Sequence, residues 1–464
     1  MTTSPGSVSP SKSVIDLVAG AVEDANPRGI AAAVHRLIRA GELRSGERLP
    51  TVRELAAALH VSPATVSEAW QALGAVGAIV ARGRAGSFVK DVVEPSRPVR
   101  YLGIGGAPSS DGLDLSTGTP DAKLLPSLKE ALERVTTRSS SWTTSYLDDP
   151  VIPSLEEVLL RTWPFQPARI TVVDGALDAL SRIVDQVVSL GDRVVMESPG
   201  FPPLIDLLER SGAEIISVEL DEQGVIPASL SAALALAPVA FFLQPRAQNP
   251  TGTSMTKYRA SELAHVLASS RALIIEDDHS GEIAMAEDVS IGQFLPLRTV
   301  HIRSYSKSHG PDLRIAAIGG SADVIDPLTA RRMLGPGWTS RLLQAVLVEL
   351  LSDAAAIDQV QTARRTYSER SAKFREALMD LGVSCSPGDG INVWVPVEDE
   401  RSALVTLAAA GVRVAPGGPF VIESASPGAV RITCGLLPDD DLLLAQAAES
   451  VARAVGAQSV LRSV

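Results

Sequence analysis

The residue best placed to react is Lys307, which follows a strand-like run that ends at Ser304. A primary amine forms a Schiff base with an aldehyde, and hydroxyl and guanidinium groups hold a phosphate. Ser304, Ser306 and Arg314 supply such groups within seven residues of the lysine. Only five lysines follow residue 90, and the other four lie in helical or loop stretches of ordinary surface character: Lys123, Lys129, Lys257 and Lys373. The segment therefore predicts a site for a phosphorylated aldehyde.

Five strand-like runs would have to position this site. They span residues 170–173, 193–196, 239–243, 272–275 and 300–303, and helical stretches separate them. Several are apolar throughout, which is typical of parallel strands that are covered on both faces. Loops that follow parallel strands meet at one edge of the sheet, where binding sites form. The pattern predicts one large α/β domain of about 350 residues.

The loops after the other four runs each offer a group that a cofactor could use. Residues 175–179 open a helix, and free backbone N–H groups at a helix start bind anions. Phe201 could stack on a flat ring, Asn249 could donate from a rigid turn, and a carboxylate of the acidic run 276–278 could pair with a protonated ring nitrogen. Taken singly, each has an ordinary explanation: a common helix start, a core phenylalanine, a turn and a solvated strand end.

The first 90 residues show a second pattern, in which helices precede a hairpin. Apolar residues recur at helical spacing in 30–38 and 52–59, and Thr51 is a suitable N-cap for the second helix. Ser62 followed by Pro63 starts a third helix. Two short strands, 78–80 and 87–89, flank a tip rich in arginine. This order predicts a winged helix-turn-helix over residues 14–90.

The polar residues of that region suit DNA binding. The N-terminal end of the last helix would enter the major groove, where the small side chains of Ser62 and Thr65 permit close approach. Arg53, together with Arg82 and Arg84 of the hairpin, could meet phosphates or the minor groove. The alternative is an interaction module with a solvated basic hairpin, because a fold class does not fix a function.

Charge and composition limit the other possibilities. The net charge is −12, yet residues 1–90 carry ten Lys or Arg against seven Asp or Glu, while the remainder carries 32 against 47. DNA binding is therefore expected in the first domain alone. No apolar run is long enough to cross a bilayer, no signal peptide is apparent, and the two cysteines and six histidines show no metal-ligand spacing. The expected compartment is the cytoplasm, and no metal is expected.

The order of these motifs resembles two known families. The runs 41–56 and 61–67 resemble the DNA-binding domain of GntR-superfamily bacterial repressors, in which the residues at Arg53, Ser62 and Thr65 contact operator DNA. Residues 110–460 resemble fold type I enzymes that use pyridoxal 5′-phosphate (PLP), the aspartate aminotransferase class. A winged helix-turn-helix fused to such a domain is the hallmark of the MocR subgroup of GntR regulators.

The PLP resemblance implies a role for each candidate residue. The Schiff base forms at Lys307, and Arg431 grips the α-carboxylate of an amino-acid effector. The remaining roles are phosphate binding (Gly175, Ala176, Leu177, Ser304, Ser306, Arg314 and, toward a neighbouring subunit, Tyr146), bonding of the ring hydroxyl (Asn249 and His279), pairing with the ring nitrogen (Asp277) and stacking on the ring (Phe201).

Two departures from the family pattern concern the same site. His279 stands where family members usually carry a tyrosine, and although imidazole can donate the same hydrogen bond, it titrates near neutral pH. The segment 146–153 lacks the usual glycine after its Asp-Pro. The groups that would bind PLP are still present, but the case for efficient transamination is weaker.

The combined interpretation is a cytoplasmic, homodimeric, PLP-dependent transcriptional regulator that binds operator DNA. It would comprise a DNA-binding domain at 14–90, a linker at 91–113 and an aminotransferase-like domain at 114–464. Its effector is an amine or an amino acid, or PLP itself. The alternative is an active aminotransferase with an appended DNA-binding head.

Overall fold

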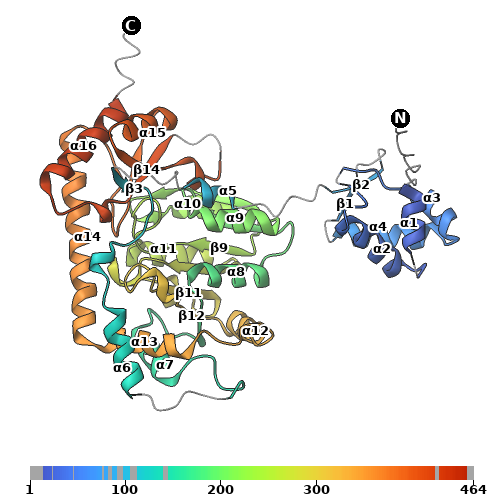
Figure 1. Ribbon diagram of the computed structural model, residues 1–464, viewed down its shortest axis with the longest axis horizontal. Coiled ribbons are helices and arrows are strands. Elements are labelled where there is room, and N and C mark those ends of the chain that lie inside the picture. The colour runs from blue at the N-terminus through green and yellow to red at the C-terminus, as the bar shows by residue number, and fades with distance from the viewer. Residues whose placement is uncertain are drawn as a thin grey trace, which may run out of the picture. The chain divides into compact units, whose positions relative to one another are not determined.

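The computed structural model describes residues 14–22, 24–44, 46–75, 78–81, 86–90, 98–104, 112–138, 145–423 and 428–456. Contacts divide the chain into two compact units, Met1–Arg97 and Pro98–Val464. The dividing point lies within the predicted linker, and a short helix, α5 (Val99–Gly103), occupies part of that same stretch. Each unit is described separately below (Figure 1).

The smaller unit is built around helices whose starts are capped by side chains. Its elements are α1 (Val14–Ala21), α2 (Pro27–Arg39), α3 (Val52–Leu59), α4 (Pro63–Ala75), β1 (Ile79–Ala81) and β2 (Ser87–Val89). Thr51 and Glu54 form a capping box at α3, as the sequence pattern predicted for Thr51. Ser62 Oγ accepts from Thr65 N at 3.2 Å at the start of α4. These capping bonds define where α3 and α4, the two helices of the helix-turn-helix, begin.

The helices and the hairpin of this unit share one apolar core. Leu37, Leu55, Val66 and Trp70 come from three different helices and are buried together. The antiparallel pair β1–β2, with Val80 opposite Phe88, completes the unit as the wing. Arginines 82 and 84, predicted to lie at its tip, fall outside the described residues.

The larger unit contains a seven-stranded sheet among its described residues, in the order β4-β12-β11-β10-β9-β5-β6. The five predicted runs correspond to β4 (Arg169–Val173), β5 (Arg193–Glu197), β9 (Ala240–Leu243), β10 (Leu273–Asp278) and β11 (Thr299–Ser304). The remaining two are β6 (Glu214–Val218) and β12 (Ala316–Gly320). Only β12 runs antiparallel to its neighbours, so the carboxyl ends of the five predicted strands meet at one edge.

The sheet is covered on both faces, which explains its uninterrupted apolar strands. In β9 the side chain of Phe241 joins one buried cluster and that of Phe242 joins another, because successive residues of a strand point to opposite faces. Helices α8 (Ala176–Val187), α9 (Pro202–Ser211) and α12 (Ala322–Met333) contribute to the cluster that includes Phe242. Helices α10 (Pro227–Leu234) and α11 (Lys257–Leu267) contribute to the cluster that includes Phe241. The strand ends are therefore held on a rigid platform.

A long helix joins this sheet to a second, smaller layer. Helix α14 (Ala354–Asp380) follows α13 (Arg341–Ser352) and extends to α16 (Asp441–Gly456) beside the smaller sheet (Figure 1). That sheet has the order β13-β15-β14-β3, comprising β13 (Val393–Pro396), β15 (Ala429–Ile432), β14 (Val412–Pro416) and β3 (Leu113–Leu115). The other described α-helices and strands of the unit are α6 (Leu128–Arg138), α7 (Pro153–Thr162), α15 (Glu400–Ala409) and the ribbon β7 (Leu220–Asp221)–β8 (Gly224–Val225). No helix in the described part of the chain combines the length and apolarity needed to span a bilayer.

Candidate functional site

Lys307 lies directly after β11, at the edge where the strand ends meet. Its side chain is half-buried, and Nζ donates to the carbonyl oxygen of Gly118, which precedes the large sheet in the chain. Burial lowers the pKa of Lys307 to about 8, and the charge of Arg431 acts in the same direction, while Asp277 opposes the change. A neutral amine is the nucleophile, so this setting favours attack on an aldehyde near neutral pH.

Asp277 is a buried carboxylate with one oxygen left unpaired. The acidic run 276–278 is buried throughout, so the solvated strand end considered from sequence is not what the structure shows. Oδ2 of Asp277 accepts from Gln244 Nε2 at 2.8 Å, whereas Oδ1 has no donor among the described residues. Burial raises the pKa of Asp277 to about 6. A protonated ring nitrogen would supply both the missing donor and a compensating charge.

His279 also presents an unpartnered buried atom. Its Nε2 lies 3.2 Å from Ser280 Oγ, and its Nδ1 has no partner among the described residues. Burial lowers the pKa of His279 to about 3, and the charge of Lys307 contributes. The expectation of an imidazole that titrates near neutral pH is therefore wrong, because desolvation keeps the ring neutral.

The start of α8 offers backbone donors, as the sequence suggested. Gly175 precedes the helix with φ 105°, and no described side chain caps the N–H groups of Ala176 and Leu177. A Cβ at position 175 would lie 2.9 Å from Nη2 of Arg314, so only glycine lets the guanidinium approach this closely. An uncapped helix start beside an arginine is suited to a phosphate.

The other predicted phosphate ligands lie around the same turn. Nη2 of Arg314 donates to the carbonyl oxygen of Asp174 at 2.9 Å, which places the guanidinium at the end of β4. Ser304 is buried, and its Oγ accepts from Ser306 N at 3.3 Å. The structure brings the ends of β4 and β11 together around these groups.

Arg431 is a buried guanidinium on β15 that faces the same region. Only 2% of its surface is exposed, Nη1 donates to Asn249 Oδ1 at 3.2 Å, and Nη2 donates to the carbonyl oxygen of Ser116. Its guanidinium carbon lies 5.1 Å from the ring centroid of Phe420. In the described part of the chain no carboxylate forms an ion pair with Arg431, and burial lowers its pKa to about 10. A ligand carboxylate would satisfy it.

The two predicted aromatic residues differ in their placement. Phe201 precedes α9 and lines a small cavity together with Gln244 and Asp277, so it lies near the unpaired carboxylate. Tyr146 is 86% exposed, and its ring centroid lies 6.2 Å from that of Trp338. Among the described residues of one chain, no hydrogen bond or ring contact joins Tyr146 to the residues around Lys307.

Sequence reasoning missed two residues that support this site. Gln244 follows β9 and contacts both Asp277 and the backbone of Asn249. Glu197 ends β5, accepts from Gln244 N at 3.0 Å, and burial raises its pKa to about 8. The signal that could have found them was positional: both are polar residues at the ends of apolar strands that lead into candidate loops.

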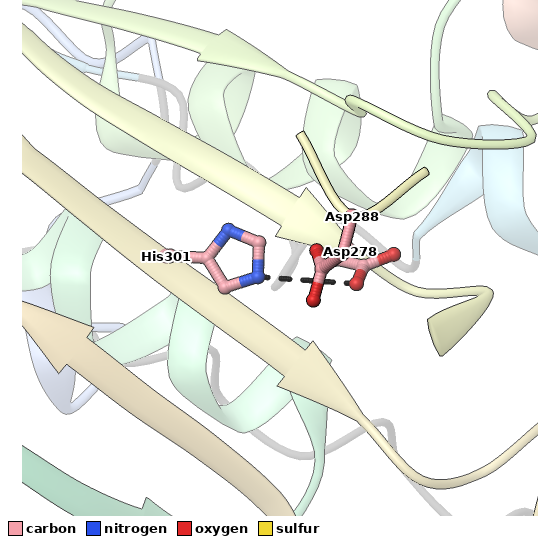
Figure 2. Close-up of side chains that lie close together, drawn as sticks. All are labelled: Asp278, Asp288 and His301. Atoms are coloured by element: carbon pink, nitrogen blue, oxygen red, sulfur yellow. Dashed lines mark ion pairs between the residues drawn. The ribbon is translucent and has the colours of Figure 1, made fainter. Parts of the chain in front are cut away.

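Asp278, Asp288 and His301 form a second polar cluster (Figure 2), in which Asp278 and His301 are buried and Asp288 is half-buried. One ligand atom from each lies within 4.8 Å of the others, as a metal site requires. However, Arg246 lies 2.5 Å from Asp278, and Arg303 lies 2.9 Å from Asp288. Because two guanidinium groups already compensate these carboxylates, a divalent cation would meet strong repulsion, and we assign no metal here.

The predicted DNA-binding residues lie on the smaller unit. Arg53 is exposed on α3, and Ser62 is exposed at the start of α4. Thr65 is half-buried there, with its Oγ1 2.8 Å from Ser62 Oγ. Arg82 and Arg84 lie outside the described residues. Among these predicted residues, therefore, the exposed basic group is that of Arg53 on α3 and the exposed hydroxyl group is that of Ser62 at the start of α4.

Comparison with known proteins supports both halves of this description. The profile of the aminotransferase class I and II family matches residues 110–447, and the profile of the bacterial regulatory proteins of the gntR family matches residues 27–89. The vitamin B6 salvage pathway transcriptional repressor PtsJ of Salmonella typhimurium is 35% identical, over 88% of this chain and 94% of its own length. The chain belongs to the MocR subgroup of GntR-type transcriptional regulators.

Two further similarities concern a regulator and an enzyme. The pyridoxine biosynthesis transcriptional regulator PdxR of Corynebacterium glutamicum is 27% identical, over 84% of this MocR-type chain and 87% of its own. The α-aminoadipate aminotransferase LysN of Thermus thermophilus has a TM-score of 0.68 at 21% identity, covering 80% of this chain and 96% of that one. The latter establishes the fold type I architecture of the larger unit. That fold implies PLP, and the unpaired Asp277 Oδ1 and the uncapped helix start fit such a cofactor.

The lowered pKa of Lys307 predicts how PLP attachment depends on pH. The protonated amine is unreactive, so the attachment rate should rise with pH and level off above a midpoint near 8. At pH 7 about a tenth of the amine would be neutral, far more than for an ordinary lysine. The rate can be followed by visible absorbance after PLP is added to the apoprotein.

Arg431→Gln provides the control, because removing that charge should move the midpoint upward. A midpoint at the ordinary lysine value of 10.5 in both proteins would contradict this assignment.

The unpartnered Nδ1 of His279 generates a second prediction. If the ring bonds the cofactor hydroxyl, His279→Tyr should preserve PLP affinity because a phenol supplies the same bond. His279→Ala should weaken it by about 1 kcal/mol or more. Equilibrium titration with PLP measures both. Equal PLP affinity in the wild type and both variants would mean that His279 does not bond the cofactor.

Proposed function

We propose that this protein is a PLP-dependent transcriptional regulator whose aminotransferase-like domain senses a small amine, an amino acid or PLP itself. The observation that carries the proposal is the setting of Lys307. It is an amine with lowered pKa, in the same site as a carboxylate with one unpartnered oxygen and a guanidinium that pairs with no carboxylate among the described residues. The N-terminal part of the same chain is a GntR-type domain.

In the proposed cofactor site, residues at the ends of different strands would bind different parts of PLP. PLP supplies an electrophilic aldehyde that accepts amines. Lys307 would hold the aldehyde end, and Asp277 would hold the ring nitrogen. Arg314, the two serines 304 and 306, and the first turn of α8 would hold the phosphate. Asn249 and His279 would bond the ring hydroxyl, while Phe201 would stack on the ring.

Arg431 supports an effector that carries a carboxylate. Its guanidinium is buried and has no counterion in the described part of the chain, so an amino acid could place its carboxylate there and its amine near Lys307. PLP itself is the second candidate effector. The names of the similar regulators PtsJ and PdxR refer to vitamin B6 salvage and pyridoxine biosynthesis, which favours control by PLP.

A continuous set of contacts leads from Arg431 to the start of the larger unit. Arg431 stacks on Phe420, and the next residue, Val421, accepts from Arg100 Nη1 at 2.6 Å. Arg100 belongs to α5, whose first turn is capped by Asp206, with Oδ1 accepting from Arg100 N at 3.2 Å. Helix α5 is the first described element after residue 90, so it is placed to transmit a change at Arg431 to the linker.

The remaining partners follow from the family and are proposals. The smaller unit would bind operator DNA through Arg53, Ser62 and Thr65, with Arg82 and Arg84 of the wing. A homodimer would read two half-sites, and the exposed Tyr146 would reach the phosphate of a neighbouring subunit. Such a regulator would act in the cytoplasm. The predicted division at 14–90, 91–113 and 114–464 can be tested by limited proteolysis.

The proposed function predicts that a ligand changes DNA affinity. Fluorescence anisotropy with DNA from beside the protein's own gene should show a change of about fivefold or more on addition of PLP, alone or with candidate amino acids. Lys307→Ala should abolish that response while basal DNA binding persists, because the lysine lies in the other unit.

Arg53→Ala is the complementary control, since it should lose DNA binding and keep the visible absorbance of bound PLP. DNA affinity that never responds to PLP or amines would contradict the proposal. Steady turnover of an amino acid with a keto acid would instead favour the aminotransferase alternative.

The contacts of α5 predict a variant that binds ligands but does not respond to them. Arg100→Ala removes the bonds to Val421 and Glu209, so the effect of ligand on DNA affinity should fall by about threefold or more. PLP affinity should stay unchanged because, in the described part of the chain, the hydrogen bonds of Arg100 go to Asp206, Pro419, Val421 and Glu209, none of which is a proposed cofactor residue. Arg210→Ala, at an exposed position of α9, is the matched control. If ligand changes DNA affinity equally in both variants, the contacts of Arg100 do not transmit the effect of the ligand.

A further inference from the structure

Gln244 connects the ends of three neighbouring strands beneath the proposed cofactor ring. Its carboxamide Nε2 donates to Asp277 Oδ2 at 2.8 Å, and its Oε1 accepts from Asn249 N at 2.8 Å. Its own backbone N donates to Glu197 Oε2 at 3.0 Å. The residue is buried, with 7% of its surface exposed. One side chain thus touches the residue proposed for the ring nitrogen and the backbone of the residue proposed for the ring hydroxyl.

These bonds fix the orientation of the amide. Because a backbone N–H occupies Oε1, the NH₂ end must face Asp277, and the opposite orientation would set an oxygen against a carboxylate. Asp277 Oδ2 is therefore occupied, and Oδ1 alone remains available for a ligand. Gln244 selects which oxygen of the carboxylate is presented.

The amide also leaves the charge of Asp277 in place. The adjacent Asp278 shows the contrast: burial would raise its pKa, but Arg246 and His301 outweigh that effect and lower the pKa to about 2. Asp277 receives a neutral donor instead of a guanidinium. Burial raises the pKa of Glu197 to about 8, which favours its neutral form at pH 7 and so limits any second negative charge beside Asp277. Lys307 is the nearby cation that acts on Asp277, but in the described part of the chain it makes no ion pair with it, so a cationic ring nitrogen is the natural partner of the unpartnered oxygen.

We propose that Gln244 is a positioning residue that makes the site specific for rings with a basic nitrogen. It presents a single oxygen of a carboxylate that no described guanidinium pairs with, so a ring that can be protonated binds more tightly than a ring with C–H in that position. This inference rests on the proposed PLP function and adds the group that sets the ring specificity of the site.

The test compares PLP with 1-deaza-PLP, in which C–H replaces the ring nitrogen. The apoprotein should prefer PLP by about tenfold or more, the usual size of a charge-assisted hydrogen bond. Gln244→Leu removes the donor and Gln244→Glu opposes Asp277 with an acceptor, so both should reduce this preference by at least about threefold. The ¹⁵N chemical shift of labelled PLP reports in parallel whether the ring nitrogen is protonated.

Gln344→Leu is the matched control, because Gln344 is a buried glutamine that bonds Ile152 N, Pro150 O and Thr339 O away from the cofactor residues. It should lower the melting temperature and leave the preference intact. If the Gln244 variants weaken PLP and 1-deaza-PLP equally, the residue is only structural and the inference is overturned. If wild type binds neither compound, the proposed function itself fails, so the two failures are distinguishable.

Discussion

Burying a carboxylate without an ion-pair partner is costly, and Asp277 has none among the described residues, although the charge of Lys307 acts on it. One oxygen is bonded by a neutral amide and the other has no donor among the described residues. The strand ends around it are arranged so that a ligand can supply what is missing. The nearby amine of Lys307 and guanidinium of Arg431 are likewise desolvated, and the pKa of each is lowered by burial. A ligand that pairs with these three groups offsets the free-energy cost of their desolvation, which strengthens its binding.

The sheet separates Asp277 from its neighbours Glu276 and Asp278, so that Asp277 is open to a ligand while the other two are bonded within the protein. Successive side chains of β10 point to opposite faces, so Asp277 lies on one face while Glu276 and Asp278 lie on the other. The latter two join His301, Arg246 and neighbouring donors in a compensated network. That network holds the end of the strand in place, so Asp277 cannot move toward an ion-pair partner of its own. The proposed cofactor-binding residues are thus held in place by a polar network on the opposite face of the strand, made by Glu276 and Asp278.

A regulator needs this site to affect its DNA-binding unit, and the described contacts connect Arg431 to α5 at the start of the larger unit. Phe420 forms one side of the Arg431 environment, and the following backbone holds α5 through Arg100. Such a connection works only if a ligand binds two arrangements with different affinity. The guanidinium bond from Arg431 to Asn249 is a candidate for exchange, because a ligand carboxylate would compete for the same donor.

The sequence by itself determined the architecture and most of the proposed site. Apolar strands alternating with helices required a sheet covered on both faces, and the loop residues from Gly175 to Lys307 then had to meet at one edge. Capping signals such as Thr51 are local, so they could be read directly. Only the tertiary structure decided the partners of Gln244, the neutral state of His279 and the compensated cluster around His301. These depend on burial and on contacts between residues far apart in the chain, and desolvation acts on a group only after the surrounding strands have packed.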